Sequence, residues 1–330
     1  MTEILIKSFN RPFYLDRCIL SIKMNVSGNF KIKVLDDGTP KKYLDKMRNK
    51  YPDVEISLSE SYEKKIEAIE ENLKSGKPIN GFEIPTKFWY ENVKKASEYV
   101  IVTEDDVWFT QPINVDELSQ EAKNLNINLI KLGWLGNQSN RKDLIIESIS
   151  ENLESAQPKD LLFFPKMLME AFFYNQYKFY TILYKLGKVN HFTQLKYWAL
   201  NSILMGFYKK EYWLEIWKDM DGKVDEKRQL INAALFYKKN KNKSKFIHRN
   251  SDTFIQRSRS QHVGNLKIKQ LKLTKTKLFG AHFSIVFSKE MNCIMGGRGS
   301  GKTTILTLIK WCLSPDTAFS KTELSLIKAN

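Results

Sequence analysis

The feature that most constrains the fold of this chain is the alternation of short apolar runs with longer amphipathic runs over its first 137 residues. The apolar runs have the length of buried strands, and the runs between them place apolar side chains at helical spacing. Strands separated by helices predict a mostly parallel sheet with helices on both faces, which is an α/β architecture. The expected strands are Ile4–Ser8, Lys31–Leu35, Val54–Leu58, Tyr99–Thr103 and Asn128–Leu132, and the expected helices are Pro12–Met24, Tyr43–Lys50, Glu60–Lys74 and Thr86–Glu98.

Polar side chains directly follow three of these expected strands. The three segments are Ser8-Phe9-Asn10-Arg11-Pro12, Asp36-Asp37-Gly38 and Glu104-Asp105-Asp106. Ligands of such sheets bind at the carboxyl ends of the strands, so these side chains are candidates for one binding site. Each segment alone also has a structural explanation. Asn and Pro are common where helices begin, Asp-Asp-Gly forms turns, and consecutive acids are typical of helix caps and surface clusters.

The order and spacing of the three segments resemble those of the family 2-like glycosyltransferases of the GT-A fold, over about residues 1–137 and more weakly to about 262. The resemblance implies metal-dependent transfer of a hexosyl or related group from a nucleoside-diphosphate sugar to an acceptor hydroxyl, with inversion, in polysaccharide or glycoconjugate synthesis. Mg²⁺ or Mn²⁺ would neutralise the departing diphosphate.

The same resemblance implies a role for individual residues. Asp106, in the position of the family's D-x-D motif, and His262 are the implied metal ligands, although an exposed histidine of a basic segment also explains His262. The implied contacts to the nucleotide sugar are Phe9, Asn10, Arg11, Asp36, Asp37, Glu104 and Asp105.

An inverting transferase also needs a general base, and in this family a carboxylate after the metal-binding strand takes that role. Asp225 and Glu226 are the candidates here. The lysine and arginine side chains around them support a second explanation, in which both acids form surface ion pairs of a helix. The aromatic stretch 163–217 also has two explanations: a helical, aromatic-packed subdomain, or an acceptor platform or membrane-surface face.

A phosphate-binding loop near the C-terminus is predicted by a match to G-x-x-x-x-G-K-[ST]. An expected strand, Met291–Met295, precedes it, and an expected helix, Thr304–Leu313, follows it. Backbone N–H groups of such a loop surround phosphates, the lysine reaches the terminal phosphates and the next hydroxyl binds Mg²⁺. The candidate ATP-binding residues are Gly296, Gly299, Ser300, Gly301, Lys302, Thr303 and Thr304.

Residues 265–313 resemble the N-terminal lobe of ABC-like ATPases of the chromosome-maintenance and DNA-repair type. Leu266–Leu273 and His282–Phe287 alternate like the antiparallel strands that begin such a lobe. After Leu313 there is no apolar strand ending in Asp-Glu and no signature sequence, and phosphoryl transfer needs several such parts together. The expectation is a small, incomplete C-terminal P-loop lobe that binds ATP without hydrolysing it.

The formal net charge is +16, and much of the excess lies between Lys238 and Lys277, where Asp252 is the single acid. A solvated basic linker explains this segment, and binding to phosphate or anionic lipid is the alternative; nucleic acid is disfavoured as a partner but stays open. The three cysteines are far apart, the start lacks a signal sequence, and no apolar run has membrane-spanning length. A soluble cytoplasmic protein is therefore expected, with peripheral attachment to the inner face of the membrane as the alternative.

Two domains are predicted. Residues 1–262 form the transferase, with a nucleotide-sugar-binding half (1–137) and an acceptor, aromatic helical half (138–262), and residues 263–330 form the partial P-loop ATPase lobe. The expected partners are a nucleotide sugar and a glycan or lipid-linked acceptor. The alternative function is an ATP-binding ABC-like ATPase fragment to which the N-terminal domain is an accessory.

Overall fold

The computed structural model describes residues 1–132, 144–150, 153–202, 205–240, 245–249, 254–256, 270–276, 280–287, 302–313 and 324. The chain divides into two compact units, residues 1–259 and residues 260–330. The predicted domain boundary at residue 262 stays a prediction.

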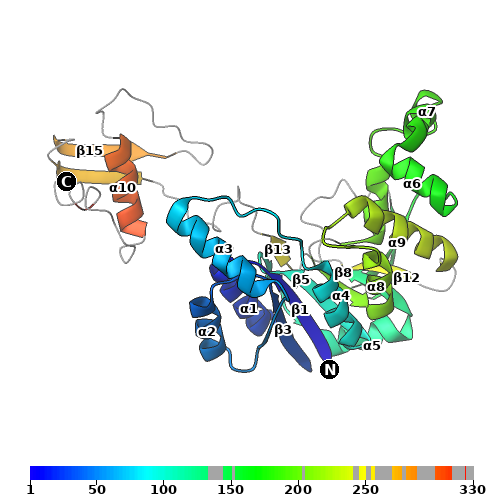
Figure 1. The fold of residues 1–330 in the computed structure, drawn as a ribbon, viewed down its shortest axis with the longest axis horizontal. Helices are drawn as coiled ribbons and strands as arrows, with labels where there is room; N and C mark the ends of the chain where they lie inside the picture. The colour runs from blue at the N-terminus through cyan, green and yellow to red at the C-terminus, as the bar shows by residue number, and fades with distance from the viewer. Residues whose placement is uncertain are drawn as a thin grey trace. The chain divides into compact units, whose positions relative to one another are not determined.

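A nine-stranded mixed sheet lies at the centre of the first unit, with strand order β4-β3-β1-β5-β11-β8-β12-β10-β9 (Figure 1). Its strands are β1 Thr2–Ser8, β3 Phe30–Asp36, β4 Glu55–Leu58, β5 Tyr99–Glu104, β8 Ile127–Lys131, β9 Leu144–Ser148, β10 Leu153–Pro158, β11 Gly206–Lys209 and β12 Lys245–Arg249. Two short pairs lie beside the sheet: β2 Val26–Ser27 with β7 Ile113–Asn114, and β6 Val107–Phe109 with β13 Phe254–Gln256.

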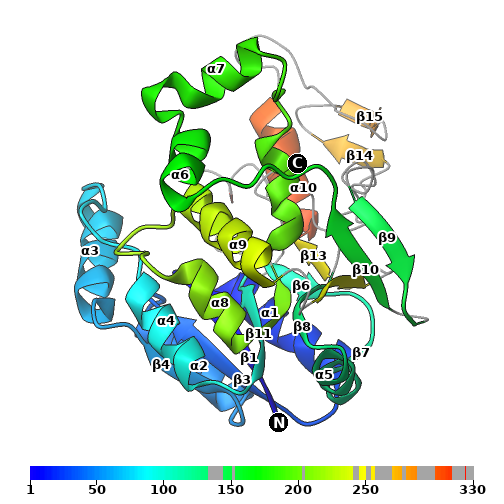
Figure 2. The same ribbon diagram turned by 90° about the vertical axis from the view of Figure 1, so that its right-hand side faces the viewer.

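The strands β4, β3, β1 and β5 run parallel to one another. Both faces of β1 and β5 are covered, so each contains a continuous apolar run, Ile4–Ile6 and Tyr99–Val102. In β1, Ile4 and Ile6 pack into one hydrophobic core with α1 (Pro12–Asn25), and Leu5 packs into a second core with α4 (Thr86–Lys95). Figure 2 shows α1 and α4 on opposite faces of the sheet. The predicted α/β class, with parallel strands between helices, is confirmed.

The other half of the sheet is mixed and carries an aromatic core. Strand β11 is antiparallel to both β5 and β8, β12 is parallel to β8, and β10 is antiparallel to both β12 and β9. Rings from the stretch 163–217, among them Phe172, Tyr197 and Trp213, are buried in this core. Many aromatic side chains of that stretch therefore belong to the hydrophobic core and are not exposed to a partner.

The helices expected in the first 98 residues all form, and their ends differ from the predicted ones by no more than three residues. The remaining helical elements of the first unit are α2 Lys41–Lys50, α3 Tyr62–Ser75, α5 Val115–Asn124, α6 Lys166–Tyr174, α7 Phe179–Lys185, α8 Lys210–Trp217, α9 Glu226–Asn240 and the 3₁₀ segments η2 Gln176–Lys178 and η3 Gln194–Leu200. Among the described residues, no helix combines the length and apolarity that a membrane span requires.

The second unit contains an antiparallel pair and a helix within its described residues. Strands β14 (Gln270–Thr276) and β15 (Gly280–Val286) pair with each other, and α10 spans Lys302–Leu313. These elements overlap the two predicted strands and the predicted helix. The predicted strand Met291–Met295 lies outside the described residues.

Candidate active site

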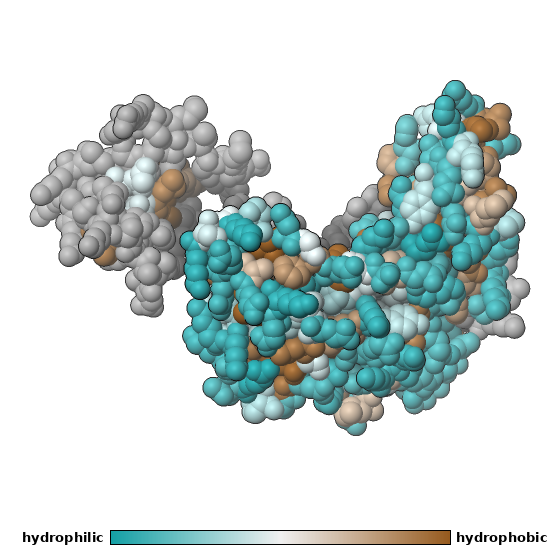
Figure 3. Space-filling model, viewed as in Figure 1, coloured by the Kyte–Doolittle hydropathy of each residue, from teal (hydrophilic) through white to brown (hydrophobic). Residues whose placement is uncertain are grey.

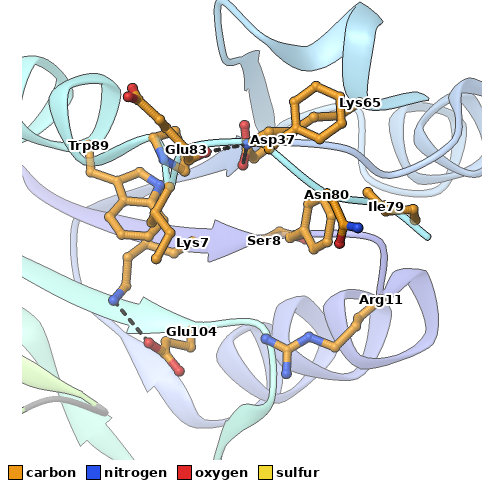
Figure 4. A pocket seen from close by; sticks show the side chains of 15 residues that line it. Lys7, Ser8, Arg11, Asp37, Lys65, Ile79, Asn80, Glu83, Trp89 and Glu104 are labelled. Atoms are coloured by element: carbon orange, nitrogen blue, oxygen red, sulfur yellow. Dashed lines mark hydrogen bonds and ion pairs between the residues drawn. The ribbon is translucent and has the colours of Figure 1, made fainter. Parts of the chain in front are cut away.

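A cavity of about 540 Å³ opens at the carboxyl ends of β1, β3 and β5 (Figure 4). Parallel strands end at a common edge, so the register places Ser8 beside Asp36 and Lys7 beside Glu104. Segment 79–85, Lys65 of α3 and Trp89 of α4 complete the lining. The predicted residues that line the cavity are Phe9, Arg11, Asp37 and Glu104. The predicted residues that do not line it are Asn10, Asp36, Asp105, Asp106, Asp225 and Glu226.

Lys7, near the end of β1, is held between a carboxylate and two indole rings. Its Nζ lies 3.0 Å from Glu104 Oε1, and 4.9 and 5.1 Å from the ring centroids of Trp89 and Trp217. The side chain is 7% exposed. An ammonium over indole faces is attracted by the ring quadrupoles. These contacts fix one positive charge in the wall of the cavity.

Arg11 connects the start of α1 to the acids that follow β5. Its Nη2 lies 2.6 Å from Asp105 Oδ1, and its Nη1 donates to Asp106 Oδ2 at 2.7 Å. Asp105 is fully buried, and burial raises its pKa to about 7 although Arg11 acts in the opposite direction. Burial also raises the pKa of Asp106. The two acids therefore lie behind Arg11, which itself faces the cavity.

The two acids of the Asp36-Asp37 turn have different surroundings. Asp36 is fully buried, and its Oδ1 accepts hydrogen bonds from the N–H groups of Gly38 (3.0 Å) and Thr39 (2.8 Å). Burial raises its pKa. Asp37 lines the cavity, accepts a hydrogen bond from Ser59 Oγ at 2.5 Å and forms an ion pair with Lys65. Asp36 holds the turn, and Asp37 is the acid placed to contact a ligand.

Lys65 links the turn after β3 to the segment 79–85. Besides its ion pair with Asp37, it donates to the Glu83 carbonyl at 2.8 Å, and its Nζ lies 5.8 Å from the ring centroid of Phe9. Charged side chains of an amphipathic helix such as α3 usually face solvent, but Lys65 is only 3% exposed. A buried ammonium needs a partner, and Asp37 provides it.

Phe9 and Asn10 leave the end of β1 in different directions. Phe9 lies at the cavity rim with 41% of its surface exposed. Its ring packs closely on Gly38. A Cβ built at residue 38 would lie only 2.7 Å from Phe9 Cε2. Asn10 is exposed and has a φ of +48°, a conformation that Asn tolerates better than most residues. This left-handed residue lies where the chain turns from β1 into α1.

The candidate base residues lie at the start of α9. Asp225 accepts hydrogen bonds from the Tyr174 hydroxyl at 2.6 Å and from the Arg228 N–H at 3.0 Å. Burial alone would raise the Asp225 pKa, but these hydrogen bonds outweigh it and lower the pKa. Glu226 is exposed. The preceding loop touches the cavity wall, because the Gly222 carbonyl accepts a hydrogen bond from Ile84 N–H at 2.8 Å.

Several predicted residues fall outside the described residues: His262, Gly296, Gly299, Ser300 and Gly301. Helix α10 begins at Lys302, two residues before the predicted start at Thr304. Thr303 is exposed and Thr304 is buried.

One carboxylate oxygen next to the cavity residue Arg11 is available to a divalent cation. Asp106 Oδ1 is buried, and no hydrogen bond to it occurs within the described residues. The described parts of the chain contain no group of three His, Cys, Asp or Glu side chains arranged for a metal. Mg²⁺ usually takes one or two protein carboxylates together with substrate phosphates. Asp106 with a diphosphate is a donor set of that kind.

The cavity residues that the sequence-based prediction does not include are led by three with functional side chains, Lys7, Lys65 and Trp89. Lys7 carries a usable signal, because it is a charged residue that directly follows the apolar run Ile4-Leu5-Ile6 inside the predicted strand. A charge within a buried strand needs a partner, which is common at binding sites. Lys65 and Trp89 have no comparable signal, because each lies in an amphipathic helix where such residues are ordinary.

Comparison with known proteins adds one family and several solved structures. A family model described as an AAA domain matches residues 265–327. No curated protein matches the sequence. The crystal structure of S. aureus TarS 1–349 in complex with UDP-GlcNAc is 13% identical, with 82% of this chain and 62% of that chain covered and a TM-score of 0.46.

Two further solved structures are similar. Mannosyltransferase PcManGT from Pyrobaculum calidifontis, in complex with GDP-Man and Mn²⁺, is 12% identical, covers 69% of this chain and 49% of that chain, and has a TM-score of 0.34. Galactosyltransferase LgtC, in complex with donor and acceptor sugar analogues, is 10% identical, covers 70% of each chain and has a TM-score of 0.33. This chain thus spans less than two thirds of the TarS fragment and about half of PcManGT.

Proposed function

We propose that residues 1–262 are a glycosyltransferase that moves a sugar from a nucleoside-diphosphate sugar to an acceptor hydroxyl. One observation carries the proposal: Phe9, Arg11, Asp37 and Glu104 follow or end three different parallel strands and line one cavity. Ligands of open α/β sheets bind outside the carboxyl ends of the strands. The volume of about 540 Å³ is in the ordinary range for a small-molecule site.

The charges that line the cavity support a requirement for a divalent cation. The basic side chains are Lys7, Arg11 and Lys65, and the acidic ones are Asp37, Glu83 and Glu104. Because these charges balance, the lining by itself does not offset the negative charge of a diphosphate. Mg²⁺ or Mn²⁺ held by Asp106, the acid behind Arg11, would add positive charge next to the cavity and, when bound, would stabilise the departing diphosphate as a Lewis acid.

The side chains of the cavity have distinct proposed roles. The ring of Phe9 packs against the nucleobase, and Asp37, held in place by Lys65 and Ser59, accepts hydrogen bonds from the base or ribose. Lys7 and Arg11 keep fixed positive charge beside the diphosphate, and their paired carboxylates hold them in position. Such preorganised charge contributes strongly to catalysis when charge develops in the reaction.

The proposed chemistry is a single displacement. The acceptor oxygen forms a bond to the anomeric carbon while the bond from that carbon to the diphosphate oxygen breaks, and attack from the opposite face inverts the anomeric centre. The hydroxyl proton passes to a carboxylate, for which we propose Asp225 or Glu226. Support comes from the contact between the loop before α9 and Ile84 of the cavity wall.

A thermal-shift titration tests the donor site. The protein is heated with UDP-, GDP-, dTDP- and CDP-sugars, each with and without Mn²⁺, and with ATP–Mg²⁺ in parallel. A ligand that binds only the folded state raises the unfolding temperature. We expect one nucleoside-diphosphate sugar to do so only with Mn²⁺. If ATP–Mg²⁺ raises the unfolding temperature and none of the nucleotide sugars does, the transferase proposal is contradicted.

Asp225→Asn separates the proposed base role from a helix-capping role. Asn caps helices about as well as Asp, so stability should change by less than about 0.5 kcal/mol. Loss of a general base lowers turnover by about 10²–10⁴-fold. Glu226→Gln is measured beside it, because the two residues are alternatives. Normal turnover in both variants would remove them from the reaction.

A second function is proposed for residues 263–330, where the AAA-domain match and the start of α10 at Lys302 favour ATP binding. Lys302→Ala should abolish stabilisation by ATP–Mg²⁺ and leave stabilisation by the nucleotide sugar unchanged. If the nucleotide sugar has no effect and ATP does, the chain is better described as an ATPase fragment with an accessory N-terminal domain. The proposed setting is the cytoplasm, in polysaccharide or glycoconjugate synthesis.

A further inference from the structure

Residues 176–196, here called the tip, form the outer end of the aromatic helical half (Figures 1 and 2). The tip contains η2, α7 and the start of η3. The inner side of α7 presents Phe179, Tyr180 and Leu183 to the hydrophobic core. Its outer side therefore faces away from the unit that it belongs to.

The outer side of the tip is unusually apolar for an exposed surface. Tyr177 is 91% exposed, and Figure 3 shows apolar groups gathered at the end of the projection formed by α6 and α7. The other large exposed apolar side chains of the tip are Ile182, Tyr184, Leu186, Phe192 and Leu195. Clustered exposed apolar residues on a soluble domain mark an interaction surface more often than scattered ones do.

The charge of the tip is entirely positive. From Ala171 to Lys210 the sequence contains six lysines and no aspartate or glutamate. Lys178, Lys185 and Lys188 are exposed, and none of them forms an ion pair within the described residues. The nearest acid before this stretch, Glu170, is 2.5 Å from Arg228 and so is already paired.

The backbone before α7 is held in a conformation that non-glycine residues rarely adopt. Asn175, Tyr177 and Lys178 have φ angles of +53°, +54° and +54°. Each such residue costs about 1 kcal/mol or more, and such residues are concentrated at functional sites. The three together turn the chain between α6 and α7, where Tyr177 and Lys178 are left in solvent.

We propose that the tip binds the surface of a membrane that carries anionic lipids. Tyr, Phe and Leu side chains enter the boundary between head groups and acyl chains, and lysines on the same surface contact lipid phosphates. Tyr suits this boundary because its ring is apolar and its hydroxyl is polar. The inference does not depend on the proposed transferase activity.

The composition of the tip favours lipid over the other candidate partners. A sugar platform uses aromatic faces, and Ile182, Leu186 and Leu195 have none. A nucleic acid would be attracted by the lysines, but its phosphates gain nothing from exposed aliphatic side chains. A lipid surface offers phosphates to the lysines and acyl chains to the apolar side chains.

Co-sedimentation of the full chain with vesicles tests the proposal. Vesicles of phosphatidylcholine alone are compared with vesicles that also contain phosphatidylglycerol, at low and high salt. We expect binding to the anionic vesicles only, with partial loss at high salt because exposed charges are screened. The charge variant Lys178→Glu/Lys185→Glu/Lys188→Glu and the apolar variant Ile182→Ser/Leu186→Ser/Phe192→Ser should each lower binding by at least about tenfold.

The matched control is Lys41→Glu/Lys42→Glu/Lys46→Glu, which makes the same change of charge on the exposed lysines of α2. We expect it to bind vesicles within about twofold of the unchanged chain. Equal loss in this control would show that binding follows total charge, and wild-type binding by both tip variants would show that another surface is responsible. Either outcome overturns the proposal. Melting curves of all variants verify that they are folded.

Discussion

Basic side chains at the cavity and at the tip differ in whether carboxylates pair with them. Lys7, Arg11 and Lys65 are each held by at least one carboxylate at the ends of parallel strands. The exposed lysines of the tip stand in a stretch with no acid at all. Paired, immobilised charge suits a small ligand of defined geometry, whereas unopposed charge on a mobile side chain suits an extended surface. The same residue type therefore serves two purposes, and its surroundings decide which.

The largest expected effect comes from removing a carboxylate behind Arg11. Asp106→Ala removes both the proposed metal ligand and one partner of the guanidinium, so sugar transfer should fall by about 10³-fold or more, measured at saturating donor and Mn²⁺. ATP binding that depends on Lys302 should survive.

Asp45→Ala is the control for this change, because Asp45 is an exposed acid 2.9 Å from Arg48. Surface ion pairs contribute about 0–1 kcal/mol, so transfer should stay within about twofold. Full transfer activity in Asp106→Ala would disprove the metal assignment.

The next effect concerns the buried ion pair of the cavity wall. Lys65→Ala leaves Asp37 buried without its cation, which should lower the free energy of unfolding by about 3–5 kcal/mol at neutral pH. Urea unfolding measures this. Lys46→Ala, an exposed lysine of α2, should change the same quantity by less than about 0.5 kcal/mol. A loss of under about 1 kcal/mol for Lys65→Ala would mean that water or another cation replaces the lysine.

A third prediction uses a partly buried lysine elsewhere in the sheet. Burial lowers the pKa of Lys131 to about 8, and its Nζ donates to the Trp198 carbonyl at 2.8 Å. Between about pH 8 and the ordinary lysine pKa of about 10.4, the unfolded chain holds more protons than the folded one, so this lysine makes stability rise with pH. The rise should reach about 2–3 kcal/mol.

Urea unfolding of the unchanged chain and of Lys131→Met at several values of pH isolates this contribution from those of other groups that titrate in the same range. The difference between the two curves should grow from pH 8 upward. Lys123→Met, on the surface of α5, should follow the unchanged chain. Parallel curves for the Lys131→Met variant and the unchanged chain would show that Lys131 keeps an ordinary pKa.

The smallest expected effect is on donor binding at the cavity rim. Phe9→Ala removes the ring proposed to face the nucleobase, which should raise the Kd of the donor by about fivefold to tenfold, or about 1 kcal/mol. Calorimetric titration measures it. Phe13 is a matched control, since it is more exposed than Phe9 and does not line the cavity. Equal effects of Phe9→Ala and Phe13→Ala would place the nucleobase elsewhere.

Local pattern was sufficient to predict the N-terminal elements and the edge of the sheet where the site lies. Apolar runs such as Ile4-Leu5-Ile6 have few alternatives to a buried strand, and parallel strands share an edge, so the turns at Phe9, Asp37 and Glu104 were expected to meet. The register of β1 with β3 and β5 agrees with this expectation. Which acid of each turn faces the cavity was not predictable, because adjacent residues differ only in the direction of one side chain.

The sequence by itself determined the α/β class, the positions of its early strands and helices, and the three polar turns at the strand ends. Only the tertiary structure decided that Lys65 meets Asp37, that Trp217 lies over Lys7, and that the tip exposes Tyr177 while similar rings are buried. The periodicity of apolar residues shows which face of a segment is apolar, because that face is defined by residues close together in the chain. Which distant segment covers that face depends on how the whole core packs, and no local pattern records it.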